Sequence, residues 1–98
     1  MKLNKVFVYG IFLDEDSRKA YGMTNPEYAT VQGYATFGHY IVQAERVKNT
    51  EACLTGLICD IQPDKWGNLD KLERGYDREV ITTTAGDRAW IYVRRKHA

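Results

Sequence analysis

The nine residues 53–61 constrain the fold of this chain more than any other stretch. Their sequence, Cys-Leu-Thr-Gly-Leu-Ile-Cys-Asp-Ile, puts apolar side chains on both faces of the strand that its alternation predicts. Leu57 and Ile61 share one face. Leu54 and Ile58 share the other, beside a glycine in the middle of the stretch. A strand that is apolar on both sides and contains a central glycine fits a closed or strongly curled sheet better than an open two-layer sheet.

Similar patterns predict the remaining secondary structure. Strands are expected over residues 5–9, 28–37, 40–44, 53–61, 76–84 and 88–93. The first of them is apolar on both faces, so it is expected to be a central strand. Helices are expected over residues 14–22 and 63–75, and each ends at a glycine. The first helix carries acids before bases, and the second opens on a proline.

Glycine, proline and polar residues mark the connections between these elements. The pair Asn25-Pro26 predicts a turn, and residues 45–51 predict a loop. Gly33 is expected to bend its strand or to allow a bulge. Gly86 lies between the last two strands and predicts a hairpin with a type II′ turn.

Length and charge limit the chain to a small domain without an obvious macromolecular partner. Its 98 residues fit one compact core, so a single domain is expected over residues 1–98. The net charge of +1 favours neither nucleic acid nor an acidic membrane as a partner. The sequence has no secretory signal and no apolar run of about 18 residues, so a cytoplasmic protein of a reducing compartment is expected.

The cysteines and histidines predict neither a disulfide nor a metal site. Cys53 and Cys59 lie six residues apart in one strand, about 20 Å at the usual rise, so they cannot bridge and both are expected in the core. His39 and His97 have no companion at metal-ligand spacing.

Two features, each weak on its own, could carry chemistry. Tyr9, Gly10, Ile11 and Phe12 leave the first strand, and successive backbone N–H groups there could bind an anion. Glu73 lies in the last turn of the second helix, where the helix dipole disfavours the ionised carboxylate and favours a general base. Each feature has a structural alternative, an ordinary turn for the loop and a solvated surface acid for Glu73.

Neighbouring charged and aromatic residues leave two interpretations open. Asp70 lies three residues before Glu73, too close on one helix for the opposed carboxylates of a glycosidase, and a structural ion pair with Arg74 is expected. Arg78 is a candidate for binding a substrate carboxylate, and an exposed strand face is its alternative. Tyr92 on the last strand is a candidate for substrate contact, with the aromatic core as its alternative.

Five segments, in the same order along the chain, resemble the gamma-glutamylcyclotransferase-like family. They are Val-Phe-Val-Tyr-Gly at 6–10, Val-Gln-Gly-Tyr at 31–34, Leu-Thr-Gly-Leu-Ile-Cys-Asp-Ile at 54–61, Leu-Asp-Lys-Leu-Glu at 69–73 with Tyr-Asp-Arg at 76–78, and Ala-Trp-Ile-Tyr-Val at 89–93. The resemblance covers almost the whole chain. It implies an α+β fold: a small mixed, mostly antiparallel β-barrel of about six strands with two or so flanking helices.

The resemblance also implies an activity. In that family the loop after the first strand binds the amino acid end of a γ-glutamyl group through backbone amides, and the glutamate after the Leu-Asp-x-Leu run moves protons. The substrate's own α-amine attacks its γ-carbonyl and releases 5-oxoproline and a free amine or amino acid. The matching residues here are Tyr9, Gly10, Ile11 and Phe12 in the loop and Glu73 as the base. The reaction requires no cofactor and no metal.

Two departures from the family pattern and two alternative functions stand beside the enzyme. Ile11 and Phe12 occupy positions where the family usually has Thr or Ser and then Leu, so an inactive relative that binds a small metabolite or a protein partner is the first alternative. The chain ends soon after the last strand, so we expect an open cavity or one that another subunit covers. The second alternative is an OB-like barrel that stacks single-stranded nucleic acid, against which the near-neutral charge counts. Its stacking residues would be Phe7, Tyr34, Phe37 and Trp90.

Overall fold

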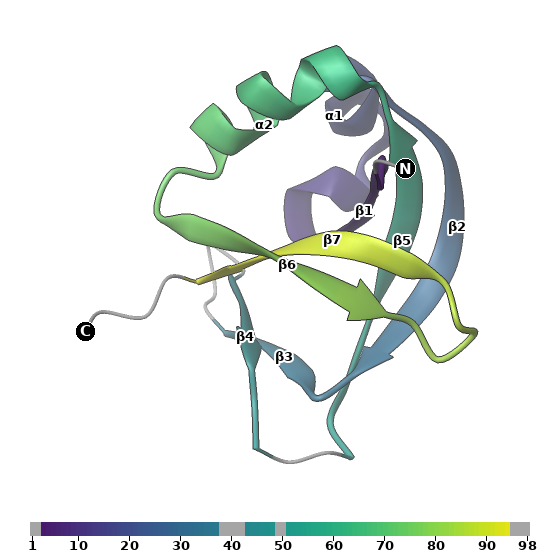
Figure 1. The fold of residues 1–98 in the computed structure, drawn as a ribbon, viewed down its shortest axis with the longest axis vertical. Coiled ribbons are helices and arrows are strands. Elements are labelled where there is room, and N and C mark those ends of the chain that lie inside the picture. Colours follow the sequence, from purple (N-terminus) through teal and green to yellow (C-terminus); the bar gives the residue numbers. More distant parts are fainter. Residues whose placement is uncertain (1–2, 38–42, 49–50, 95–98) are drawn as a thin grey trace.

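The chain folds into one strongly curled β-sheet, with two short helices at one end and a two-stranded ribbon at the other (Figure 1). The computed structural model describes residues 3–37, 43–48 and 51–94. The strands of this part are β1 (Lys5–Val8), β2 (Met23–Gln32), β3 (Tyr34–Phe37), β4 (Gln43–Arg46), β5 (Cys53–Ile61), β6 (Tyr76–Thr82) and β7 (Arg88–Arg94). The helices are α1 (Glu15–Ala20) and α2 (Trp66–Leu72), each preceded by a short 3₁₀ helix, η1 (Gly10–Leu13) and η2 (Pro63–Lys65).

The main sheet is mixed and mostly antiparallel. Its strand order is β2-β5-β1-β7-β6. The first strand is central, as predicted, because it pairs antiparallel with β5 and parallel with β7. The outer pairs, β2 with β5 and β6 with β7, are antiparallel. The predicted fold class, a mixed sheet with two helices, is therefore confirmed.

The sheet is open, which corrects the expectation of a closed barrel. Within the described residues no ladder joins β2 to β6, although the Thr84 N–H donates to the carbonyl of Thr30 at 2.8 Å. The chain leaves the main sheet at Gly33, whose φ of +83° lies in the left-handed region that glycine adopts freely. The predicted strand 28–37 is divided there, and β3 pairs with β4 in a separate ribbon.

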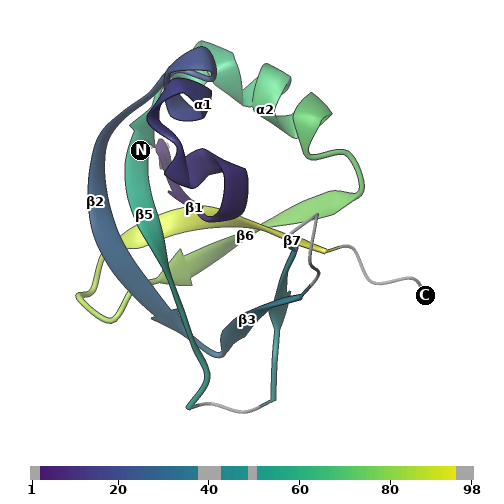
Figure 2. The ribbon, with the colours of Figure 1, turned by 180° about the vertical axis from the view of Figure 1, so that it is seen from behind.

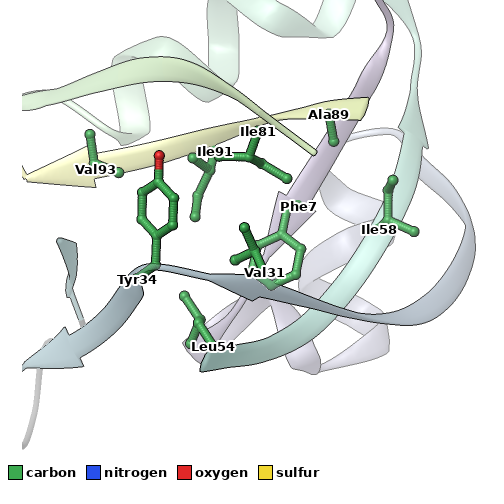
Figure 3. Close-up of a cluster of buried hydrophobic side chains, with 9 residues drawn as sticks. All are labelled: Phe7, Val31, Tyr34, Leu54, Ile58, Ile81, Ala89, Ile91 and Val93. Atoms are coloured by element: carbon green, nitrogen blue, oxygen red, sulfur yellow. The ribbon is translucent and has the colours of Figure 1, made fainter. Parts of the chain in front are cut away.

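Both faces of the sheet bury apolar side chains, as the pattern of residues 53–61 predicts. The face inside the curl holds a first cluster, in which side chains from β2 and β5 point toward those of β6 and β7 (Figure 3). Its members are Phe7, Val31, Tyr34, Leu54, Ile58, Ile81, Ala89, Ile91 and Val93. The second cluster brings the other face together with η1 and α2, through Val6, Val8, Phe12, Met23, Leu57, Cys59, Ile61, Leu69 and Tyr92. The central strands are thus packed on both sides.

The curl requires a glycine at position 56, in the middle of β5. A Cβ atom on Gly56 would lie 2.3 Å from the carbonyl oxygen of Val8 and 2.9 Å from Cζ of Phe7. The carbonyl belongs to the backbone of a central strand, so it cannot rotate away. Because any side chain here would force β5 and β1 apart, only glycine allows the two strands to approach as they do.

The two predicted helices are present and shorter than expected. Asp14 caps α1 by accepting a hydrogen bond from the Ser17 N–H at 3.0 Å, so the first helix begins at the acidic residues where the sequence predicts it. The second predicted helix begins as η2 and continues as α2, which ends before Glu73. Gly75 follows with a φ of +94°, a conformation that stops the helix where the sequence predicts.

The 3₁₀ helix η1 was not predicted, because its four residues show no helical periodicity and no capping side chain. Arg18 of α1 supports its carboxyl end. The Nη1 atom of Arg18 donates to the carbonyls of Phe12 at 2.9 Å and of Leu13 at 2.7 Å. The loop after β1 is therefore a fixed helical turn that α1 holds in place.

The predicted turn at Asn25-Pro26 is a bulge within β2. The pairing register with β5 shifts between Thr24 and Glu27, and Asn25 has a left-handed φ of 52°. Its amide Nδ2 donates to Asp60 on the partner strand at 2.9 Å. The strand therefore runs on from Met23 instead of starting at Tyr28, which corrects the expected boundary.

The hairpin between β6 and β7 is confirmed, but its expected type II′ turn is wrong. The Thr83 N–H donates to the Asp87 carbonyl at 2.7 Å, and the Gly86 N–H donates to the Thr83 carbonyl at 2.9 Å. Gly86, with a φ of +91°, thus closes a three-residue loop instead of opening a two-residue turn.

Two expectations concern the region of β4. This strand begins at Gln43 and extends to Arg46, so it includes the first part of the predicted loop 45–51. The rest of the expected strand 40–44 lies outside the described residues.

The expectation that both cysteines lie in the core holds for only one of them. Cys59 is buried in the second cluster, whereas Cys53 is exposed and belongs to neither cluster, and the two cysteines form no disulfide. His39 and His97 lie outside the described residues. Within the described part, no group of three His, Cys, Asp or Glu residues could hold a metal ion, and no helix is long and apolar enough to cross a membrane.

Candidate functional site

A cavity of about 970 Å³ opens beside the end of β1. Figure 2 shows η1 and α1 at the same end of the molecule as α2, although the two regions are far apart in the sequence. The residues that line the cavity are Phe7, Val8, Tyr9, Gly10, Ile11, Phe12, Ser17, Ala20, Tyr21, Leu69, Leu72, Glu73, Arg74, Tyr76 and Tyr92. The cavity thus brings together the loop after β1 and the end of α2, the two features that the sequence singles out.

Glu73 lines this cavity and is half-buried. It follows α2 directly, and its N–H donates to the carbonyl of Leu69 at 2.9 Å. Burial raises the pKa of the Glu73 carboxyl above its usual value near 4.5. The described residues offer its carboxylate no hydrogen bond and no ion pair. A half-buried carboxylate holds a proton more readily than a solvated one, so it is the stronger proton acceptor of the two.

The four residues of the predicted binding loop all line the cavity. Tyr9 precedes η1, and Gly10 begins it with a left-handed φ of 64°. Ile11 is 71 % exposed, whereas Phe12 is buried and packs edge to face on Tyr21, with 5.5 Å between ring centroids. The first N–H groups of a helical turn have no carbonyl to bind within the turn, so those of Gly10 and Ile11 are the donors that this loop can offer to a ligand.

Tyr92 links the sheet to α2 at the wall of the cavity. Its hydroxyl donates to Oδ1 of Asp70 at 2.5 Å, and its carbonyl accepts a bond from the hydroxyl of Tyr9 at 2.8 Å. Burial, followed by the hydrogen bond to Asp70, raises the pKa of the Tyr92 phenol far above its ordinary value. The phenol is therefore a neutral hydrogen-bond donor over the physiological range of pH.

Arg78, predicted as a candidate for binding a substrate carboxylate, is not among the residues that line the cavity. Its Nε atom lies 3.2 Å from Oδ1 of Asp70, in an ion pair. Its guanidinium carbon lies 4.6 Å from the ring centroid of Trp66 and 5.3 Å from that of Trp90. The ion pair that the sequence predicts for Asp70 with Arg74 is thus made with Arg78, because β6 brings this arginine back against α2.

Several residues of the wall were not singled out in the sequence. Arg74 and Tyr76 follow Glu73 at the turn into β6, and Ser17 and Tyr21 come from α1 and the residue after it. In the sequence, only their closeness to the predicted binding loop and to Glu73 could have indicated that they line the cavity. Charged or aromatic residues next to a predicted base are common on surfaces, so position alone does not distinguish Arg74 from a solvated cation.

Three of the four aromatic residues of the nucleic-acid alternative make contacts within the protein. Phe7 and Tyr34 are buried in the first cluster. The Trp90 indole donates to the carbonyl of Leu3 at 3.0 Å and lies against Arg78. Base stacking needs exposed rings, and these three are occupied by contacts within the protein.

A sequence comparison assigns the chain to a family. The model described as "Gamma-glutamyl cyclotransferase, AIG2-like" matches residues 6–98, which is nearly the whole chain. No curated protein matches the sequence.

Comparison with solved structures gives several similar folds. The Arabidopsis thaliana protein At5g39720.1 has a TM-score of 0.80 and 23% identity, with 100% of this chain and 72% of that chain covered. The uncharacterised protein PH0828 from Pyrococcus horikoshii has a TM-score of 0.73 and 14% identity, with 95% and 79% covered. A structure named gamma-glutamyl cyclotransferase has a TM-score of 0.69 and 12% identity, with 99% and 69% covered. At these identities the likeness shows a shared fold.

Proposed function

We propose that this chain, which belongs to the gamma-glutamyl cyclotransferase, AIG2-like family, converts a γ-glutamyl amine or γ-glutamyl amino acid into 5-oxoproline and a free amine or amino acid. One observation carries the proposal. A half-buried acid with a raised pKa, Glu73, lines the same cavity as the loop of residues Tyr9, Gly10, Ile11 and Phe12. A proton acceptor and a set of backbone donors are the two things that the reaction needs from a protein.

The reaction is an internal acyl transfer. The neutral α-amine of the substrate attacks the γ-carbonyl carbon, forming the bond that closes the five-membered ring. Glu73 accepts the proton that the attacking nitrogen loses and gives a proton to the departing nitrogen as its bond to the γ-carbon breaks. Because attacking and attacked atoms belong to one molecule, holding the substrate folded supplies much of the acceleration.

The loop has two tasks in this proposal. The N–H groups at the start of η1, those of Gly10 and Ile11, bind the α-carboxylate of the substrate or the carbonyl oxygen that gains charge during attack. Both tasks use backbone atoms, so they do not depend on a hydroxyl side chain. The exposed Ile11 and the buried Phe12 can therefore perform both tasks without a side-chain hydroxyl.

The chemistry of the loop also favours a second candidate function. Residues 10–13 provide no side-chain hydroxyl, since they are glycine, isoleucine, phenylalanine and leucine. A site that needs such a group for turnover would bind γ-glutamyl compounds here without cyclising them. The second candidate is therefore a binding protein that uses the same cavity for a small metabolite or a protein partner.

Two measurements on one substrate panel separate the candidates. Protein is mixed with γ-glutamyl amines and γ-glutamyl amino acids, 5-oxoproline is quantified, and the melting temperature is recorded with and without each compound. Formation of 5-oxoproline supports the enzyme. Stabilisation without product supports the binding protein, because a ligand at 100 times its Kd adds about 2.7 kcal/mol of stability whether or not it reacts. Neither product nor stabilisation by any compound would remove both.

A further inference from the structure

Arg74 is the one cationic residue among the described residues that line the cavity. It follows Glu73 directly in the chain and is exposed. The described part of the chain gives its guanidinium no ion pair and no hydrogen bond. An unpaired guanidinium on the wall of a cavity is available to an anionic group of a ligand.

Two nearby arginines show what a structural role looks like in this protein. Arg18 donates to the carbonyls of Phe12 and Leu13 and so supports η1. Arg78 is held by Asp70 and lies against two tryptophan rings. Neither of these arginines lines the cavity, and both are satisfied by the protein itself. Arg74, in contrast, lines the cavity and has no ion pair or hydrogen bond from its guanidinium to the described residues.

We infer that Arg74 selects substrates whose leaving group carries a carboxylate, which makes a γ-glutamyl α-amino acid the preferred substrate over a γ-glutamyl amine. The inference rests on the proposed function and narrows its substrate class. Glu73 must reach the departing nitrogen to protonate it, so the groups on that nitrogen lie near the residue after Glu73. In an α-amino acid the carboxylate is separated from this nitrogen by a single carbon. A guanidinium binds a carboxylate through two parallel hydrogen bonds, which an uncharged amine cannot provide.

The rim of the cavity extends the inference to the side chain of the leaving amino acid. Ile11 is 71 % exposed and Leu72 is 49 % exposed, and both line the cavity. They present exposed apolar surface at the cavity from two different elements, η1 and α2. Covering such surface with an apolar group is favourable. The substrate class is therefore a γ-glutamyl derivative of an apolar α-amino acid.

A matched pair of substrates tests the role of the carboxylate. γ-Glutamyl-leucine and γ-glutamyl-3-methylbutylamide differ only in the carboxylate of the leaving group. The protein is expected to favour the leucine compound about tenfold in kcat/KM. This is the contribution of a charged hydrogen-bonded pair that is weakened by its exposure to solvent. The preference should reside mainly in KM and should shrink as salt is raised, because salt screens the exposed pair. γ-Glutamyl-glycine, which keeps the carboxylate but lacks the apolar side chain, is expected to be poorer than the leucine compound.

Two variants assign the preference to Arg74. Arg74→Met keeps a long side chain without the charge and should bring the ratio of the two kcat/KM values close to one. Lys71→Met is the matched control, since Lys71 is an exposed cation of α2 outside the cavity wall, and its ratio should stay at the wild-type value. Melting temperatures of both variants show that they are folded.

The outcomes distinguish this inference from the proposed function. Equal kcat/KM for the matched pair, or an unchanged ratio in Arg74→Met, would overturn the role of Arg74 and leave the cyclotransferase activity standing. If no compound yields 5-oxoproline, the activity is overturned, and the melting-temperature shifts given by the same pair decide the role of Arg74. Equal shifts for both compounds would then overturn it, and a larger shift for the leucine compound that Arg74→Met abolishes would support it.

Discussion

The hydroxyl of Tyr92 on β7 donates a 2.5 Å hydrogen bond to Oδ1 of Asp70 on α2, three residues before Glu73. The same oxygen atom receives Nε of Arg78 from β6 at 3.2 Å. Two strands of the sheet therefore hold one carboxylate of the short helix that carries the proposed base. The position of Glu73 in the cavity follows from this attachment, because a helix of seven residues has little stability of its own.

Removing the Tyr92 hydroxyl should loosen that attachment. We expect Tyr92→Phe to lower the free energy of unfolding by about 2 kcal/mol, since a buried donor to a charged acceptor is lost. Cyclotransferase activity should fall with it, because Glu73 is less firmly held. Urea unfolding and 5-oxoproline assays measure the two effects. Tyr28→Phe, at a position 88 % exposed, should change stability by less than about 0.5 kcal/mol. A Tyr92→Phe protein as stable as the control would show that the bond contributes nothing.

Replacing Arg78 by lysine should separate its structural role from a role in the cavity. Lysine keeps the charge but loses the planar group that lies against Trp66 and Trp90 and pairs with Asp70. Stability should fall by about 1 kcal/mol. The preference for a carboxylate on the leaving group should stay as in the wild type, in contrast to Arg74→Met. A lost preference in Arg78→Lys would instead return this residue to the substrate site.

A pair of glycine substitutions tests the packing of the central strands. Gly56→Ala should destabilise the protein by about 3 kcal/mol or prevent folding, because the added methyl group meets the Val8 carbonyl. Gly67→Ala in α2 is the control. A Cβ atom there meets nothing within 4 Å, so we expect a gain of up to about 1 kcal/mol from helix propensity. Thermal and urea unfolding report both changes, and a harmless Gly56→Ala would contradict the close approach of β1 and β5.

The raised pKa of Glu73 predicts a stability that depends on pH. The folded protein binds the Glu73 proton more tightly than the unfolded chain, so ionisation of this group costs stability as the pH rises from its usual value near 4.5 through the raised value. Glu73→Gln should therefore be more stable than the wild type at neutral pH, and the difference should shrink below pH 4.5. Urea unfolding across this range measures it. Glu27→Gln, at an exposed position of β2, is the control for loss of a surface charge. A Glu73→Gln protein that gains nothing at neutral pH would contradict the burial of an ionised Glu73.

Much of this arrangement follows from local patterns in the sequence. Apolar residues on both faces identify β1 and β5 as buried strands, and the glycine between Leu54 and Leu57 predicts a strongly curled sheet. Asp14 and Gly75 mark where helices start and stop. These features depend on neighbours along the chain, so one sequence is enough to predict them.

Other features depend on residues that are far apart in the sequence. The alternation of residues along β6 does not indicate whether the Arg78 side chain faces the cavity or the outside of the sheet. Its position is fixed by contacts with Trp66 and Trp90, which belong to other elements of the fold. Gly33 was recognised as a bend, but whether the chain continues the sheet or leaves it depends on pairing with β4. Glu73 was placed in the site through the family resemblance, while the cause of its raised pKa, burial in the cavity wall, needed the fold.

We propose that Glu73 moves the proton in a cyclisation that takes place in this cavity. The most direct measurement compares 5-oxoproline formation by the wild type and by Glu73→Gln at neutral pH, with substrate binding followed by melting temperature in both. We predict that the variant still binds the γ-glutamyl substrate while kcat falls by about 10²- to 10⁴-fold, the usual contribution of a general base. A Glu73→Gln protein that forms 5-oxoproline at the wild-type rate would contradict the account.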